Sequence, residues 1–93
     1  MSLSDVRAAI DHIDDQIVAL LAQRQGHVKD AARYKGDDHA VRAPDRRRAM
    51  MARLRDRASA EGVDPDVVTA TYNAMIDAFV DLEMRERRAR DDG

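Results

Sequence analysis

Cysteine and tryptophan are absent from the 93 residues, and aromatic side chains make up only 3% of them. Without cysteine the chain has neither a disulfide framework nor a thiolate metal site. Glycine and proline are scarce, at four and two residues. Alanine, leucine, valine, arginine and aspartate are frequent, and this bias favours helices over sheets. We therefore expect an all-α protein.

Long apolar runs are also missing. The opening MSLSDVRAAIDHIDDQ lacks the basic flank and apolar core of a signal peptide, and no segment approaches the roughly 18 apolar residues of a membrane span. We expect a soluble, cytoplasmic chain with no membrane partner. The net charge is only −2 although 16 residues are Lys or Arg, so bulk attraction to nucleic acid is not expected. Any role of these cations must be local.

The first predicted helix covers about residues 4–35. Ser4 and Asp5 are expected to supply its N-cap and acidic first turn, and Gly36, which can adopt a positive φ, is expected to end it. Apolar residues recur along it at spacings of three and four, which is typical of an amphipathic helix. They are Val6, Ile10, Ile13, Ile17, Leu20, Leu21, Val28 and Ala31.

Two shorter helices are predicted to follow a loop of roughly eight residues. The second helix, about 44–61, has Pro44 in its first turn and ends at Gly62. The third, about 64–88, is capped by Asp64 and is followed by a charged tail that we expect to fray. Their apolar positions are Met50, Met51, Leu54 and Ala58, and then Val68, Tyr72, Met75, Ile76, Phe79, Val80 and Leu82.

The first helix is too long for a single compact domain covering residues 1–93. About 30 residues at about 1.5 Å each give a helix of roughly 45 Å. A compact chain of this length has a radius of gyration near 12 Å, so it cannot cover the whole apolar stripe. We therefore expect a two-fold homodimer in which the long helices pair antiparallel.

Two cations lie on the stripe that this helix should bury. Arg24 and Lys35 are eleven residues apart, close to three turns, so they share a face with Val28 and Ala31. Arg7 precedes Arg24 by seventeen residues, or roughly 25 Å of helix, too far for both to hold one small molecule. In an antiparallel dimer, however, the start of one helix lies beside the second half of its partner.

The other helices add further charges to the apolar side. Glu83 follows Phe79 by four residues, and Arg46 and Arg47 begin the second helix one turn before its methionines. Burying several cations with one carboxyl is prohibitive without counter-charges. An anionic ligand would supply them.

Simpler interpretations remain open at this point. Long cationic side chains often extend from the edge of an apolar stripe into water. Glu83 is also placed to pair with Arg87 on the surface. The run RRRAMMARLRDR is basic but lacks aromatic platforms and helix-turn-helix spacing, which argues against a nucleic-acid partner. His12, His27 and His39 show no metal-ligand spacing, so we expect no metal site.

Four segments in order, DVRAAIDHIDDQIVALLAQR, VKDAARYK, APDRR and FVDLE, resemble the all-helical chorismate mutase family. The middle two look closest to the branch that includes isochorismate pyruvate lyases. The resemblance implies an intertwined homodimer of three-helix chains with two equivalent, shared pockets.

The resemblance also implies an active site and its roles. Arg24 would bind a carboxylate of a small dicarboxylate substrate, while Lys35 and Glu83 would donate hydrogen bonds to the ether oxygen of the enolpyruvyl group. Many members carry Gln at the position of Glu83, and a carboxyl donates only when it is protonated. The remaining implied substrate-binding residues are Arg7 from the partner chain, the cation Arg46, and the apolar wall residues Met50, Ile76 and Val80.

The implied reaction is the pericyclic rearrangement of chorismate to prephenate, which needs no nucleophile, metal or cofactor. Arg47 stands where members often carry a Glu that holds the ring hydroxyl, which leaves the ring substituent open. Isochorismate, split into salicylate and pyruvate, is the main alternative substrate, and an amino-substituted chorismate is another. A non-catalytic helical dimer that senses a metabolite or docks on a pathway enzyme is the alternative of a different class.

Overall fold

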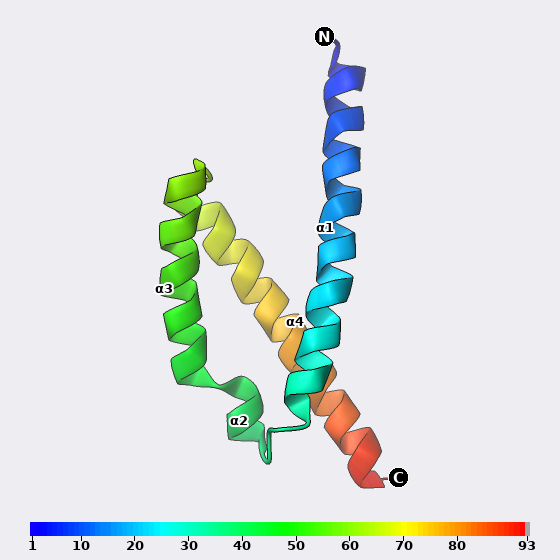
Figure 1. Cartoon of the computed structure of the whole chain (residues 1–93), viewed down its shortest axis with the longest axis vertical. Helices are drawn as coiled ribbons and strands as arrows, with labels where there is room; N and C mark the ends of the chain where they lie inside the picture. The colour runs from blue at the N-terminus through cyan, green and yellow to red at the C-terminus, as the bar shows by residue number, and fades with distance from the viewer. Residues whose placement is uncertain (93) are drawn as a thin grey trace.

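The computed structural model describes residues 1–92 and is built of α-helices joined by short connections, which confirms the all-α class (Figure 1). Gly93, the last residue of the predicted domain, lies outside the described residues. Within residues 1–92, no helix combines the length and apolarity needed to cross a bilayer. The helices are α1 (Leu3–Ala32), α2 (Asp38–Arg42), α3 (Pro44–Glu61) and α4 (Pro65–Asp92).

The helix α1 begins at Leu3, one residue before the predicted start, and its N-cap lies two residues earlier than predicted. Its N-cap is Ser2, not Ser4, and the Ser2 hydroxyl accepts a hydrogen bond from the Asp5 amide at 3.1 Å. The Asp5 carboxylate accepts in return from the Ser2 amide, also at 3.1 Å. This reciprocal capping box satisfies two amides that would otherwise lack partners at the helix start, which explains why Ser2 wins over Ser4.

At its other end α1 stops at Ala32, before the predicted boundary near residue 35. The Lys35 amide still donates to the Ala32 carbonyl at 3.2 Å, in the three-residue spacing of a tightened last turn. Gly36 does not adopt the left-handed conformation expected of it. Lys35 therefore lies in a turn beyond the helix, and contacts with other elements must fix its side chain.

The predicted loop after α1 contains the short helix α2. Asp37 caps it by accepting a hydrogen bond from the Ala40 amide at 2.8 Å. Within α2, the side chain of Val41 is buried. Ala43, in a left-handed conformation with φ of 41°, then turns the chain into α3. Five residues are too few to show a helical period, so the sequence pattern did not reveal α2.

The helices α3 and α4 form an antiparallel hairpin. Pro44 is in the first turn of α3, and Gly62 ends that helix with the left-handed φ of 77° that glycine tolerates, both as predicted. Asp64 accepts a hydrogen bond from the Asp66 amide at 2.8 Å at the start of α4. Beyond residue 88, where fraying was expected, α4 continues to Asp92.

The core lies along α4, which packs against α3, α1 and α2. The apolar residues predicted for α3 and α4 are all buried or half-buried. Among the described residues, however, the deeply buried apolar side chains are small in number and mostly small in size. They are Ala32, Val41, Ala58 and Ile76.

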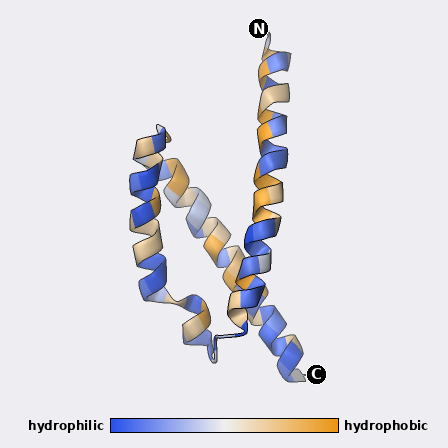
Figure 2. Ribbon diagram, viewed as in Figure 1, coloured by the Kyte–Doolittle hydropathy of each residue, from blue (hydrophilic) through white to orange (hydrophobic). Residues whose placement is uncertain are grey.

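The N-terminal half of α1 stands clear of the other helices (Figure 1), and hydrophobic residues recur along it (Figure 2). Their side chains are exposed. The radius of gyration is 16.4 Å, well above the roughly 12 Å of a compact chain of this length. The exposed residues at spacings of three and four form one stripe, which we call the outer stripe of α1. It consists of Leu3, Val6, Ile10, Ile13, Ile17 and Leu20.

We predict opposite effects for two glycine-to-alanine changes. Gly62→Ala should lower the free energy of unfolding by about 1 kcal/mol, because an L-residue is strained at φ of 77°. Gly26→Ala, within α1, should raise it by about 0.5–1 kcal/mol, because alanine favours helix and its methyl group would meet no atom within 4 Å. Urea unfolding followed by circular dichroism, at one protein concentration, measures both. Changes of the same sign would contradict these assignments.

Candidate active site

One cavity of about 440 Å³ lies between the C-terminal half of α1, α2, α3 and α4. Cavities of this size typically hold small molecules. Arg7 does not line this cavity, because it lies in the exposed N-terminal half of α1. The other seven predicted site residues, which are 59 positions apart at the extremes, all line it: Arg24, Lys35, Arg46, Met50, Ile76, Val80 and Glu83.

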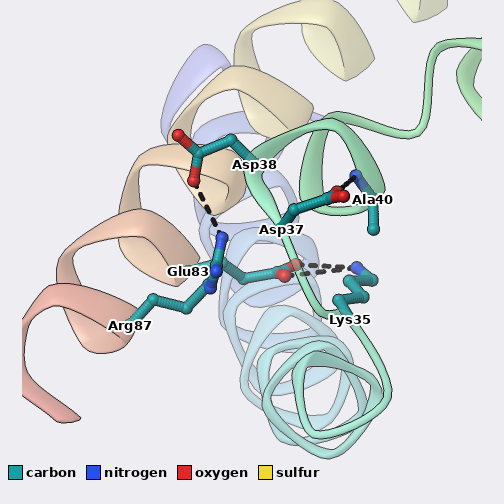
Figure 3. A network of polar contacts seen from close by, with 6 residues as sticks. All are labelled: Lys35, Asp37, Asp38, Ala40, Glu83 and Arg87. Atoms are coloured by element: carbon teal, nitrogen blue, oxygen red, sulfur yellow. Dashed lines mark hydrogen bonds and ion pairs between the residues drawn. The ribbon is translucent and has the colours of Figure 1, made fainter. Parts of the chain in front are cut away.

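Lys35 and Glu83 form an ion pair at the cavity (Figure 3). The Lys35 Nζ atom lies 3.2 Å from both carboxylate oxygens of Glu83. Glu83 is only 4% exposed, and burial of a carboxylate is unfavourable unless a cation lies against it. The alternative in which Glu83 pairs with Arg87 on the surface is wrong, since Arg87 binds Asp38 instead.

Arg24 presents a buried hydrogen-bond donor at the site. Its Nη1 atom is buried and has no hydrogen-bond partner within the described residues. The guanidinium carbon lies 4.9 Å from the ring centroid of Phe79, so a cation–π contact holds the group against α4. A buried donor without a partner costs free energy, and such groups are rare in folded proteins. Arg24 is thus preorganised to donate to an acceptor that the chain itself does not supply.

Arg47, by contrast, is fully engaged with α4. Its Nη1 atom lies 2.8 Å from Asp77 Oδ1, and its Nη2 atom donates to Asn73 Oδ1 at 3.2 Å. The neighbouring Arg46 is exposed at the edge of the cavity. The charge of Arg47 is therefore balanced by the protein, whereas that of Arg46 faces solvent and the cavity mouth.

The cavity has a strong excess of positive charge. Among the described residues that line it, Glu83 is the only carboxylate, and Lys35 already neutralises it. No cluster of three or more metal-ligating side chains occurs within residues 1–92. A small anion with an apolar body fits this lining best, since guanidinium groups bind carboxylates in two-point geometry. Six cations contribute: Arg24, Lys35, Arg42, Arg46, Arg47 and Arg53.

Several lining residues were not predicted as site residues. Arg53 follows Arg46 by seven residues and His27 follows Arg24 by three, so helical spacing carried a usable signal for both. Arg42 and Val41 belong to α2, where no periodic pattern exists, and sequence reasoning had no means of placing them.

Comparison with known proteins identifies the family of this chain. The family model for chorismate mutase type II matches residues 6–84, a range that contains every predicted site residue from Arg7 to Glu83. The isochorismate pyruvate lyase of Pseudomonas aeruginosa is 36% identical over 78 residues, which cover 84% of this chain and 77% of that protein. The chain therefore belongs to the chorismate mutase type II family.

Proposed function

We propose that this protein is a chorismate mutase that rearranges chorismate to prephenate. The observation that carries the proposal is the buried, unpartnered guanidinium of Arg24 beside the Lys35–Glu83 pair in a cationic cavity. Membership of the chorismate mutase type II family supports the same reaction class. Met50, Ile76 and Val80 give the cavity apolar walls for the body of the substrate.

The proposed mechanism is electrostatic and conformational. In the rearrangement the ether C–O bond breaks while a C–C bond forms within the same molecule, so no group enters or leaves. Arg24, together with Arg46 and the partner's Arg7, holds the two carboxylates and keeps the enolpyruvyl arm over the ring, which lowers the entropic part of the barrier. Lys35 donates to the ether oxygen, where negative charge develops in the transition state, and thereby stabilises that state over the substrate.

The charged residues that line the cavity affect which substituent the ring of the substrate can carry. An amino-substituted chorismate with a protonated amine would require a free carboxylate, and Glu83 is already bound to Lys35. A neutral hydroxyl avoids this conflict because it accepts as well as donates hydrogen bonds. The lining therefore favours a hydroxylated ring over an aminated one.

Isochorismate pyruvate lyase is the second candidate function. The Pseudomonas aeruginosa relative with that name supports it, and the same carboxylate and ether-oxygen contacts serve both reactions. Isochorismate would be split by a related pericyclic step into salicylate and pyruvate. The two substrates share their charge and differ in where the ring hydroxyl stands.

A direct assay distinguishes these functions. We predict that the purified protein consumes chorismate and forms prephenate, with slower or no conversion of isochorismate. Faster formation of salicylate and pyruvate from isochorismate would establish the lyase instead, and turnover of the amino-substituted compound alone would identify a third substrate. Stabilisation against heat by chorismate with no turnover of any substrate would favour a non-catalytic metabolite sensor.

We further propose that the protein is a homodimer whose outer stripes of α1 pack together. These apolar side chains have no cover within the described chain, and their spacing suits packing of one helix against another. An antiparallel arrangement would bring Arg7 of one chain to the cavity of its partner, 17 residues along α1 from Arg24. Each cavity would then be completed by the second chain.

A mixed-dimer experiment tests the shared site. Sedimentation of the wild type should give about twice the 10.4 kDa chain mass. Arg7→Ala and Arg24→Met chains should each be folded but inactive. After subunit exchange at equal concentrations, half of the dimers should be hybrids with one intact pocket, so activity should return to about a quarter of the wild-type value. A well-folded monomer, or no recovery on mixing, would contradict the shared pocket.

The role of Glu83 has its own test. If Glu83 donates to the ether oxygen, the amide of Glu83→Gln can make the same donation, and this variant should keep activity. If Glu83 serves instead as the anchor of Lys35, Glu83→Gln should be slower, because it lacks the charge that the Lys35 amine binds. Initial rates at saturating substrate measure this.

A further inference from the structure

Lys35 lies outside any helix, so its position depends on how the segment between α1 and α2 is held. Two side chains of α4, one turn apart, hold this segment (Figure 3). Glu83 binds the Lys35 amine, as described above. Arg87 binds the backbone and side chain that follow: Nη1 lies 2.8 Å from Asp38 Oδ1, and Nη2 donates to the Gly36 carbonyl at 3.1 Å.

Substrate binding would affect the contact of Glu83 with Lys35 and the contacts of Arg87 differently. Under the proposed function, Lys35 must direct one of its three N–H groups at the ether oxygen, so substrate entry would rearrange the contact of the amine with Glu83. The contacts of Arg87 lie outside the cavity, since neither Arg87, Gly36 nor Asp38 lines it. They can persist while the Lys35–Glu83 pair is rearranged.

The geometry of Arg87 suits a clamp better than an ordinary surface ion pair. Its side chain is only 19% exposed, whereas the side chain of Asp38 is 75% exposed. The planar guanidinium reaches a carboxylate and a carbonyl at once, which a lysine amine at the same place could not match in both directions. One of its two acceptors is backbone, so Arg87 fixes the path of the chain immediately after Lys35.

We propose that Arg87 is a positioning residue that clamps residues 36–38 onto α4 and so keeps Lys35 aimed into the cavity. The inference rests on the proposed function for its catalytic consequence. Its structural part, the restraint of the segment between α1 and α2, is independent of which substrate is used. Arg87 does not line the cavity and acts only through the position of Lys35.

The test compares Arg87→Met with Arg85→Met, a matched change at an exposed arginine of the same helix. Hydrogen exchange measured by mass spectrometry should accelerate for residues 34–42 in Arg87→Met and stay unchanged in Arg85→Met. With the substrate that the wild type converts, kcat should fall about tenfold in Arg87→Met while KM changes less. Loss of Lys35 positioning affects the transition state, where the ether oxygen carries charge, more than the bound substrate.

Milder variants provide a second measurement if Arg87→Met unfolds. Arg87→Lys keeps the charge without the fork and should give an intermediate loss of kcat and intermediate exchange. Asp38→Asn should also lower kcat, and combining it with Arg87→Lys should cost less than the product of the two single effects, because both act on one contact.

The outcomes separate the clamp from the proposed function. Wild-type exchange rates at residues 34–42 in Arg87→Met and Arg87→Lys would overturn the clamp, whatever the enzyme converts. Faster exchange with unchanged kcat in an active enzyme would overturn the positioning of Lys35. Absence of turnover by the wild type would refute the proposed function, while the exchange comparison would still decide whether Arg87 restrains the segment.

Discussion

The ion pair of Lys35 with buried Glu83 is the contact on which the shape of the cavity depends. A carboxylate in a helical interior is unfavourable unless a cation lies against it. Lys35 meets that requirement from a turn beyond α1, so the pair ties the end of the first helix to the middle of the last. Removal of either partner alone would leave an uncompensated charge. It would also remove the ion pair that links the segment after α1 to α4 beside the cavity.

The remaining cations of the cavity are accommodated in different ways. Arg47 is neutralised by Asp77 and also donates a hydrogen bond to Asn73, whereas Arg46 stays in contact with solvent. The Nη1 atom of Arg24 is buried without a hydrogen-bond partner among the described residues, and the guanidinium lies against the ring of Phe79. A buried donor without an acceptor is unfavourable, and a bound carboxylate would supply one.

Helical periodicity predicted much of this arrangement because the relevant residues lie on long, regular helices. The wall residues Ile76 and Val80 follow from spacings of three and four on α4. Lys35 does line the cavity, but it lies beyond the end of α1 and is held there by Glu83, so the expected helix face shared with Arg24 does not explain its position. The resemblance to the family then indicated a role in the reaction for each of these site residues. Periodicity failed where the chain is irregular: α2, the early end of α1 and the contacts of Arg87 with Asp38 depend on caps and on pairing between distant segments. The N-cap was misplaced because two serines compete and only Ser2 forms the reciprocal bonds with Asp5.

The helix α4 carries five of the side chains that line the site, as many as α3, and all five lie on one face. Tyr72, Ile76, Phe79, Val80 and Glu83 follow one another at intervals of four, three, one and three residues, and Arg87 continues the series four residues later. One inserted or deleted residue would rotate everything beyond it by about 100° around the helix axis. A single-codon change in length within this helix would thus disconnect the aromatic support of Arg24, the anchor of Lys35 and the contact to α2 together, although no chemical group would be lost.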